Sequence, residues 1–137
     1  MPHRLKFIDD LLLVEVSGRF DRSALDALAE TIVECEADLC RSPDRLTDLS
    51  AVVHVTVKAD DLRSVLERRF SAYPPFNAFR HALVGATPLQ YGMSRMYQIL
   101  NTSPQTEMEV FTNREDALGW LRPDRAPRLR RELSLLE

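Results

Sequence analysis

The regular alternation of strand-like and helix-like segments limits the possible folds of this chain more than any other feature. Short apolar segments alternate with segments whose apolar residues recur every three or four positions, and prolines stand between several of them. The predicted order is strands at residues 4–8 and 11–18, helix 23–38, strand 45–49, helix 59–72, strand 81–86, a helix from 88 to before 104, strand 107–111 and helix 114–121. This order predicts an α/β fold with a leading strand, four strand–helix units and a mainly parallel five-stranded sheet.

Local turn and capping signals set several boundaries. The pair Asp9-Asp10 suits the tight turn of a hairpin between the first two strands. The clearest signal is the run 87–90, in which Thr is the N-cap, Pro occupies the first helical position and Gln completes a capping box. Asp21 or Ser23 can cap the first helix, and Asn113 caps the last one.

Composition excludes several classes of protein. At 137 residues, with 45% hydrophobic and 28% charged residues, the chain has the size and composition of one soluble globular domain. Its net charge of −3 gives no general attraction to nucleic acid, and no apolar run approaches the roughly 20 residues of a membrane span. The apolar run near the start is too short for a secretory signal, so the cytoplasm is the expected location.

Neither the cysteines nor the histidines indicate a metal or cofactor site. Cys35 and Cys40 lie in one helical region at a spacing unsuited to a disulfide, which predicts reduced thiols. His3, His54 and His81 are scattered and lack the paired spacing of metal ligands. The sequence also has no nucleophile elbow, glycine-rich phosphate loop or Cys-His constellation, so we predict a non-enzymatic protein without a cofactor.

The expected binding site lies at the edge where the loops follow the strands. In a parallel sheet these loops meet at the carboxyl ends of the strands, where ligands bind. The candidate residues for a ligand or a partner, at this edge and on the helix that starts there, are Asp48, Ser50, Thr56, Thr87, Gln90, Tyr91 and Arg95.

Each candidate also has a structural interpretation. Asp48 and Ser50 can satisfy the N–H groups of their own loop, and Thr87 with Gln90 is first of all a capping box. Tyr91 and Arg95 are four residues apart on one helix, so they can stack at its surface.

Two longer patterns resemble a known family. "RLTDLSAV" (45–52) resembles the "LlDls-v" strand end of the SpoIIAA-like fold, which is shared with STAS domains, the anti-sigma factor antagonist domains. "ATPLQYGMSRMYQIL" followed by "EMEVFTNREDALGWL" resembles the uncharacterised STAS/SEC14-like branch, with its "P-x-Q-x-G-x-x-R-x" and "V-F-x-x-x-x-x-A-x-x-W-L" patterns. The resemblance covers residues 4–121, so we expect a SpoIIAA-like domain at 1–121 and a separate C-terminal tail at 122–137.

The resemblance does not extend to the regulatory serine. Anti-sigma factor antagonists have a phosphorylatable serine in an Asp-Ser-Ser-Gly turn after the third strand, at the start of a helix. The corresponding place here is residues 56–59, where Thr56 stands alone and Asp60 and Asp61 fill the first helical turn. These acids already complement the helix dipole and would repel a phosphate, so Thr56 is expected to be a helix cap and not a phosphoacceptor.

Two functions follow as hypotheses. The first is a non-enzymatic cytoplasmic binding or regulatory module of the STAS-like type, which acts through protein contacts. The alternative, implied by the SEC14-like branch, is a carrier or sensor of a small apolar or lipid-like ligand. A large apolar cavity behind Leu89, Met93 and Phe111 would favour the alternative, whereas a solid core would favour the first.

The C-terminal tail predicts association. Residues 122–131 contain five arginines and one aspartate, a net charge of +4, and Leu129, Leu133 and Leu136 follow at helical spacing. Because these leucines have no obvious place in a core of four strand–helix units, we predict a homodimer in which the tail crosses to the other subunit. In the alternative, the tail folds back over its own sheet.

Overall fold

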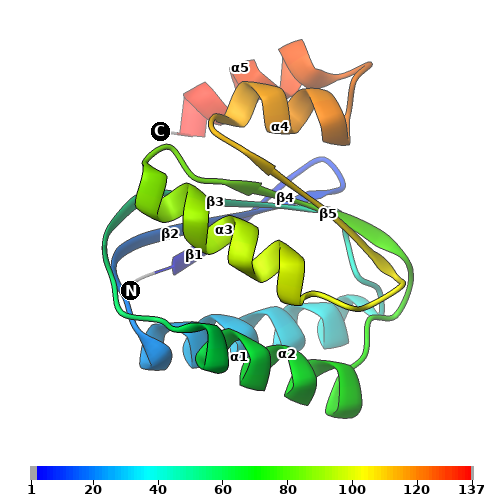
Figure 1. The fold of residues 1–137 in the computed structure, drawn as a ribbon. Helices are drawn as coiled ribbons and strands as arrows, with labels where there is room; N and C mark the ends of the chain where they lie inside the picture. Colours follow the sequence, from blue (N-terminus) through cyan, green and yellow to red (C-terminus); the bar gives the residue numbers. More distant parts are fainter. Residues whose placement is uncertain (1–2, 137) are drawn as a thin grey trace.

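The computed structural model describes residues 3–136 and contains one twisted sheet with helices on both faces (Figure 1). Helices α1, α2 and α3 cover one face, and α4 and α5 cover the other. The elements are β1 (His3–Ile8), β2 (Leu11–Phe20), α1 (Arg22–Leu39), β3 (Arg45–Val55), α2 (Ala59–Ala72), β4 (Phe79–Val84), α3 (Pro88–Leu100), β5 (Thr106–Phe111), α4 (Arg114–Leu121) and α5 (Ala126–Leu136).

The sheet has the predicted topology. Its strand order is β1-β2-β3-β4-β5, with β1 antiparallel to β2 and the other neighbours parallel. Asp9 adopts a left-handed conformation (φ 55°) in the turn between β1 and β2, a conformation that aspartate tolerates better than most residues. The carboxyl ends of β2 to β5 therefore lie at one end of the sheet, on the left of Figure 1.

Strand β3 is longer than the sequence predicted. The expected strand ended at Leu49, but β3 continues to Val55, and its extension pairs with β2 through Ala51, Val52, His54 and Val55. Its pairing with β4 stops at Asp48, opposite Val84. Beyond Asp48 the strand thus has β2 on one side and no strand on the other among the described residues.

The predicted role of Thr56 as a helix cap is wrong. Helix α2 begins at Ala59, its N-cap is Lys58, and the Asp61 carboxylate accepts a hydrogen bond from the Lys58 N–H at 2.9 Å. Thr56 lies two residues earlier, exposed, and its N–H donates to the Phe20 carbonyl at 3.0 Å, which extends the β2–β3 pairing. The tertiary contact with β2 moves the helix start away from the threonine.

The other predicted caps are present. The Asp21 carboxylate accepts from the Ala24 N–H, and the Asn113 side chain accepts from the Asp116 N–H. The Thr87 hydroxyl accepts from the Gln90 N–H at 3.2 Å, while the Gln90 side chain accepts from the Thr87 N–H at 3.0 Å. Thr87 and Gln90 form the reciprocal capping box that the sequence predicted.

We expect Thr87→Ala to lower the free energy of unfolding by about 1 kcal/mol, because the α3 N-terminus loses its cap. Thr56→Ala is the matched control, and we expect it to change stability by less than about 0.5 kcal/mol, as for an exposed residue without a capping role. Urea unfolding of the two variants measures the difference. Equal losses in both variants would show that the assigned helix starts are wrong.

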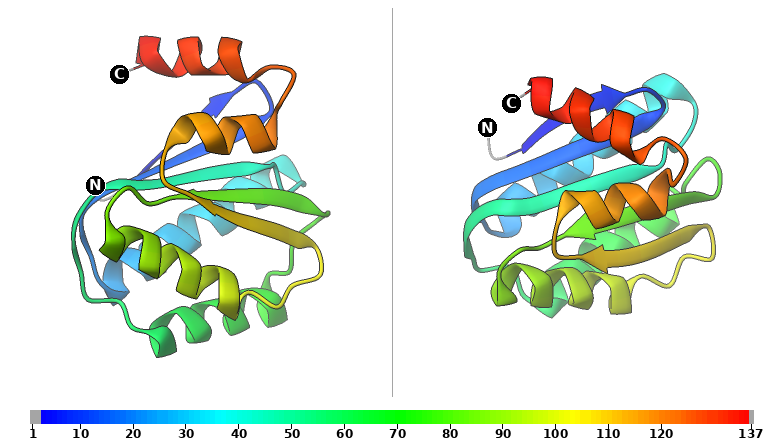
Figure 2. Two further views of the ribbon diagram at one scale, coloured as in Figure 1. Left: turned by 45° about the horizontal axis from the view of Figure 1, so that its top comes forward. Right: turned by 90° about the horizontal axis from the view of Figure 1, so that it is seen from above.

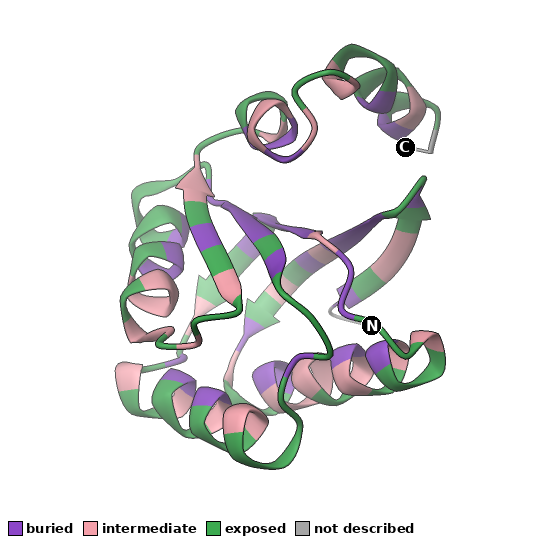
Figure 3. Cartoon of the chain, turned by 90° about the vertical axis from the view of Figure 1, so that its right-hand side faces the viewer, coloured by how far each residue is buried: buried purple, intermediate pink, exposed green. Residues whose placement is uncertain are grey.

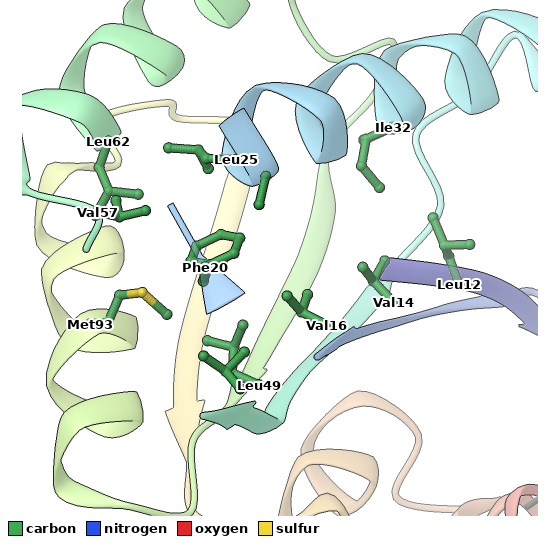
Figure 4. Close-up of a cluster of buried hydrophobic side chains, with 12 residues drawn as sticks. Leu12, Val14, Val16, Phe20, Leu25, Ile32, Leu49, Val57, Leu62 and Met93 are labelled. Atoms are coloured by element: carbon green, nitrogen blue, oxygen red, sulfur yellow. The ribbon is translucent and has the colours of Figure 1, made fainter. Parts of the chain in front are cut away.

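The core has two layers, one on each face of the sheet. Residues Leu12, Val14 and Val16 of β2 face α1, α2 and α3, while Leu11 and Leu13 face α4 and α5, as the two-residue period of a strand requires. Figure 4 shows the first layer, and Figure 3 shows that buried residues of the helices lie on the sides facing the sheet. Leu89, on the first turn of α3, is 58% exposed.

The C-terminal segment packs on its own chain. Leu129 and Leu133 of α5 are buried in the second core layer together with Ile8 and Leu11 of the hairpin. Arg125 and Arg128 pair with Asp9 in the hairpin turn. Figure 2 shows α5 beside α4 and above the β1–β2 hairpin. Leu129 and Leu133 therefore have a place in this chain, which removes the reason given for a tail that crosses to a second subunit; the side chain of Leu136, the third leucine of the predicted stripe, lies outside the described part.

Candidate functional site

Asp48 and Ser50 lie at the carboxyl edge of the sheet, where β3 parts from β4. The buried Asp48 carboxylate accepts hydrogen bonds from Ser50 N–H (2.9 Å) and Ser50 Oγ (2.6 Å), as in an Asx turn. It also accepts from Arg114 at the start of α4, and Arg114 donates to Glu15 of β2 at 2.7 Å. Burial alone would lower the pKa of Arg114, but its hydrogen bonds to Asp48 and Glu15 outweigh burial and raise that pKa. These contacts fix α4 to the edge.

Gln90 occupies the place that a neighbouring strand would have beside the extension of β3. Its Nε2 donates to the carbonyls of Ser50 (3.2 Å) and Val52 (2.8 Å), and its Oε1 accepts from the N–H groups of Ala86 (2.9 Å) and Thr87. The side chain is buried, and all four of its hydrogen bonds are to backbone groups. Gln90 thus satisfies the free edge of β3 and orients the first turn of α3.

Gly85 allows this close approach. A Cβ atom at Gly85 would lie 2.6 Å from the Gln90 carbonyl carbon and 2.7 Å from the Tyr91 nitrogen, which is closer than real side chains come to backbone atoms. The end of β4 and the first turn of α3 can therefore meet only because residue 85 has no side chain.

The remaining candidates lie on the outer surface. Thr56 is exposed in the loop before α2, and Tyr91 and Arg95 are exposed on α3. Arg95 donates to Gln98, and the cation–aromatic contacts of the described residues, Arg45 with Phe79 and Arg80 with Trp120, do not include the predicted Tyr91–Arg95 stack. The structure thus brings Asp48, Ser50, Thr87 and Gln90 together, with Tyr91 and Arg95 along the adjoining helix.

Three apolar or aromatic residues close in sequence to this hydrogen-bonded frame are exposed. Val53, next to the Val52 carbonyl that Gln90 binds, is 80% exposed, and Leu89, next to Gln90, is 58% exposed. Tyr91 is exposed one residue further along α3. Exposed apolar side chains on a rigid backbone are typical of surfaces that bind another protein. We call Val53, Leu89 and Tyr91 the edge patch.

A second cluster, which the sequence analysis missed, lies under α1 and α2 at the opposite ends of the strands. The Glu36 carboxylate of α1 pairs with Arg69 of α2 at 2.5 Å, lies 3.9 Å from Arg45 of β3, and accepts from Ser42 Oγ at 2.5 Å. The Arg45 guanidinium lies over the Phe79 ring, 5.0 Å from its centroid. Two arginines thus share one buried carboxylate.

Beside this cluster is an interior cavity of about 90 Å³. Its wall is mostly apolar and includes Phe20, Leu25, Ile32, Leu62 and Met93, whose side chains converge between the helices and the sheet in Figure 4. The polar part of the lining consists of Arg45, Thr47, Arg69, His81, Ser94 and Tyr97. Leu89 and Phe111, expected to border such a cavity, do not line it: Leu89 is exposed, and Phe111 packs on Trp120 on the other face.

His81 is the ionisable group most affected by this interior. Its ring bonds to Thr47 Oγ1 at 2.7 Å and meets the edge of the Tyr97 ring. Burial lowers the pKa of His81 well below its usual value of 6.5, and the charges of Arg45 and Arg69 lower it further. His81 is therefore neutral in the folded protein at neutral pH.

This pKa predicts a pH dependence of stability. Below pH 6.5 the unfolded chain protonates His81 while the folded chain does not, so the unfolded state binds more protons and stability falls as pH falls. The contribution of His81 approaches about 1.4 kcal/mol per pH unit. We expect His81→Gln to reduce the pH dependence of the free energy of unfolding, measured with urea between pH 7 and 5.5. Some pH dependence remains because burial also lowers the pKa of His3. Identical slopes in the two proteins would contradict the assignment.

The similarity of this chain to known proteins lies in its structure. Neither protein-family models nor curated proteins gave a match to the sequence. The structure matches the anti-sigma factor antagonist SpoIIAA in its unphosphorylated form, with a TM-score of 0.53 and 13% identity over 88% of this chain and 97% of that one. This chain has a SpoIIAA-like fold.

Two further structures with this fold are similar. An anti-sigma factor antagonist from Mycobacterium paratuberculosis has a TM-score of 0.56 and 23% identity, covering 88% of this chain and 92% of that chain. An uncharacterized protein of the DUF3478 family from Shewanella loihica PV-4, also with a SpoIIAA-like fold, has a TM-score of 0.54 and 17% identity, covering 87% and 91%. The predicted SpoIIAA-like fold, with its leading strand and mainly parallel sheet, is thus confirmed.

Two features are absent from the part of the chain that the structure describes: a membrane-spanning helix and a cluster of metal-binding side chains. None of the helices in residues 3–136 is long and apolar enough to cross a membrane. Over the same residues, no three His, Cys, Asp or Glu side chains gather in a way that could hold a metal ion.

Proposed function

We propose that this protein is a non-enzymatic regulatory module of the STAS-like type that acts in the cytoplasm by binding a protein partner at the edge patch. The observation that carries this proposal is the exposure of Val53 and Leu89, which are the sequence neighbours of the two residues, Val52 and Gln90, joined by a buried hydrogen bond. A partner would bury apolar surface there against a backbone that is already held in place, which limits the entropy lost on binding. Two of the similar structures described above are named anti-sigma factor antagonists, which supports a regulatory role.

We further propose that this module works without a phosphorylated residue in the loop before α2. The Asp61 carboxylate already accepts from the Lys58 N–H and pairs with Arg22 at 3.3 Å. Asp60 lies in the same turn. A phosphate on Thr56 would meet two carboxylates and an N-terminus whose amide is in use, so it would be repelled.

Site-specific photo-crosslinking in the source cells tests this proposal. A photoreactive residue at position 89 should give one discrete crosslinked protein. The same residue at position 99 is the matched control, because Ile99 is 69% exposed on the same helix but near its other end. With the photoreactive residue at position 91 instead, Leu89→Lys should abolish recovery of the crosslinked partner, whereas Ile99→Lys should not. Equal crosslinking at both positions, or stoichiometric phosphate on Ser50 or Thr56, would contradict the proposal.

The second candidate function is a carrier or sensor of a small ligand, and the interior cavity is the observation that favours it. Pockets for small molecules are mostly apolar with a few placed polar groups, and this cavity has that composition. Native mass spectrometry of protein purified from cells would report a bound ligand and the number of subunits together.

We also propose a homodimer. The contact between its subunits is the edge strand β1 and not the C-terminal tail. Edge strands present unpaired backbone groups that can join a second chain, and Phe7 of β1 is 44% exposed. Light scattering at high protein concentration tests this proposal, because a molar mass equal to that of the monomer would contradict a homodimer.

A further inference from the structure

We propose that the interior cavity binds a short-chain monocarboxylate, with its carboxylate at Arg45 and its hydrocarbon chain among the apolar side chains between the sheet and α1, α2 and α3. The inference rests on the second candidate function and narrows it from a lipid-like ligand to a small acid. It concerns the interior, so it is independent of the edge patch.

The charge of the cluster favours an anion. Arg45 and Arg69 are both largely buried, and Glu36 is the one carboxylate within ion-pair distance of either among the described residues. Arg69 is the nearer partner of Glu36, at 2.5 Å against 3.9 Å for Arg45. Because an arginine side chain stays protonated, the cluster carries one net positive charge in a region of low polarity. An anion beside Arg45 would balance it.

Two hydrogen-bonding atoms of the cavity lining lack a partner among the described residues. They are Arg45 Nε, on a residue 7% exposed, and His81 Nδ1, on a residue 4% exposed. Buried polar atoms in folded proteins are nearly always hydrogen-bonded, so an orphaned pair in one cavity lining points to a missing partner. Arg45 and His81 are also opposite each other in the β3–β4 register, so both atoms belong to one site.

A carboxylate fits both groups. Guanidinium N–H groups bind carboxylates with strong charge-assisted hydrogen bonds. The Thr47 hydroxyl can donate to His81 Nε2, which leaves the ring proton on Nδ1, where it can donate to the second carboxylate oxygen. Since His81 is neutral, the site supplies one positive charge, which matches a monoanion and not a phosphate dianion.

The size and the lining of the cavity define the rest of the ligand. A cavity of about 150 Å³ holds a benzene ring, so the 90 Å³ here holds roughly four heavy atoms before side chains adjust. Leu25, Ile32 and Met93 border this space and offer no hydrogen bond to a polar chain. Acids of two to four carbons have four to six heavy atoms, so they fit this space with small adjustments of the side chains around it, and long-chain lipids do not.

The ion pair between Glu36 and Arg69 lies where a ligand could enter the cavity from the surface. Arg69 lines the interior cavity, and Glu36 and Arg69 also line a surface groove of about 370 Å³. This groove lies between the end of α1 and the loop after α2, with Tyr73, Pro74 and Phe76 on its wall. Displacement of the Arg69 side chain would join groove and cavity.

Calorimetric titration of the full chain with sodium butyrate tests the inference. Butyrate should bind, and butyramide and inorganic phosphate, which lack the charge or the chain, should bind at least tenfold more weakly. Arg45→Met should weaken butyrate binding at least tenfold. Arg80→Met is the matched control and should leave binding unchanged. Arg80 precedes His81 on β4, but its partly exposed side chain lies over the Trp120 ring and pairs with Glu107, away from the cavity.

A second variant keeps the test valid if Arg45→Met alters folding. Ala29→Leu, on a helix residue that lines the cavity, fills the space and retains both arginines, and it should abolish butyrate binding. Absence of butyrate binding to the wild type, binding unchanged in Ala29→Leu, or tighter binding of octanoate than of butyrate would each overturn the inference. None of these results affects crosslinking at position 89, so the two proposals fail separately.

Discussion

Replacing Gln90 by leucine is expected to lower the free energy of unfolding by about 3 kcal/mol or more. Leucine is close to glutamine in size, so the loss reflects hydrogen bonds and not an empty space. The variant leaves the Ser50 and Val52 carbonyls and the Ala86 and Thr87 N–H groups without their partner. Each buried polar group left unsatisfied costs about 1–3 kcal/mol, and water can rescue part of the sum at this edge.

The matched control is Gln98→Leu on the same helix. Gln98 donates to the Met108 carbonyl at 2.7 Å, and this is its one bond to a strand that the described residues show. We expect about 1 kcal/mol for that loss. Urea unfolding of both variants measures the difference, provided that the free energy of unfolding depends equally on urea concentration in the two proteins. If Gln90→Leu costs no more than Gln98→Leu, Gln90 does not replace a strand neighbour of β3.

The second large effect is expected at Glu36. Glu36→Gln removes the carboxylate shared by Arg69 and Arg45, and it leaves two buried guanidinium groups with no counter-charge. Removing one partner of a buried ion pair typically costs about 3–5 kcal/mol. The Ser42 hydroxyl can still bond to the amide, so the charge accounts for most of the loss.

Two further variants test this explanation. Glu115→Gln breaks the exposed pair with Arg130, which has the same N···O distance of 2.5 Å, and it should cost less than about 1 kcal/mol. The triple variant Glu36→Met, Arg45→Met, Arg69→Met should regain most of the lost stability, since apolar replacement of a whole buried charge cluster is often neutral. A triple variant as unstable as Glu36→Gln would show that packing, and not charge, sets the loss.

The fold was predictable because its signals are local. The capping box of α3 depends on residues three apart, and strands β2 and β4 show their apolar runs directly in the sequence. The end of β3 was not predictable in this way. The strand was expected to end at Leu49 and Thr56 to cap the next helix, but pairing of Ala51 to Val55 with β2 decided the outcome, and that pairing depends on a segment over thirty residues away.

The candidate site was half predictable for the same reason. The sequence placed Asp48, Ser50, Thr87 and Gln90 at one edge, because parallel topology brings the loops together. It did not reveal that Gln90 reaches Ser50 and Val52, because this contact spans 38 to 40 residues.

The interior cluster was missed because the prediction followed the carboxyl ends, whereas Arg45 and His81 lie at the amino ends of their strands. A signal was available. Arg45 and Thr47 of β3 share the strand face of the buried Leu49, as the two-residue period requires.

The position of α5 has a consequence for how the chain is made. Its buried residues Leu129 and Leu133 cover Ile8 and Leu11, which leave the ribosome more than a hundred residues earlier. The hairpin therefore keeps an uncovered apolar face throughout synthesis, until residues 126–136 have emerged. Exposed apolar surface on an incomplete chain favours aggregation, so rapid translation through α5, or a chaperone that shields the hairpin until then, would protect the nascent chain.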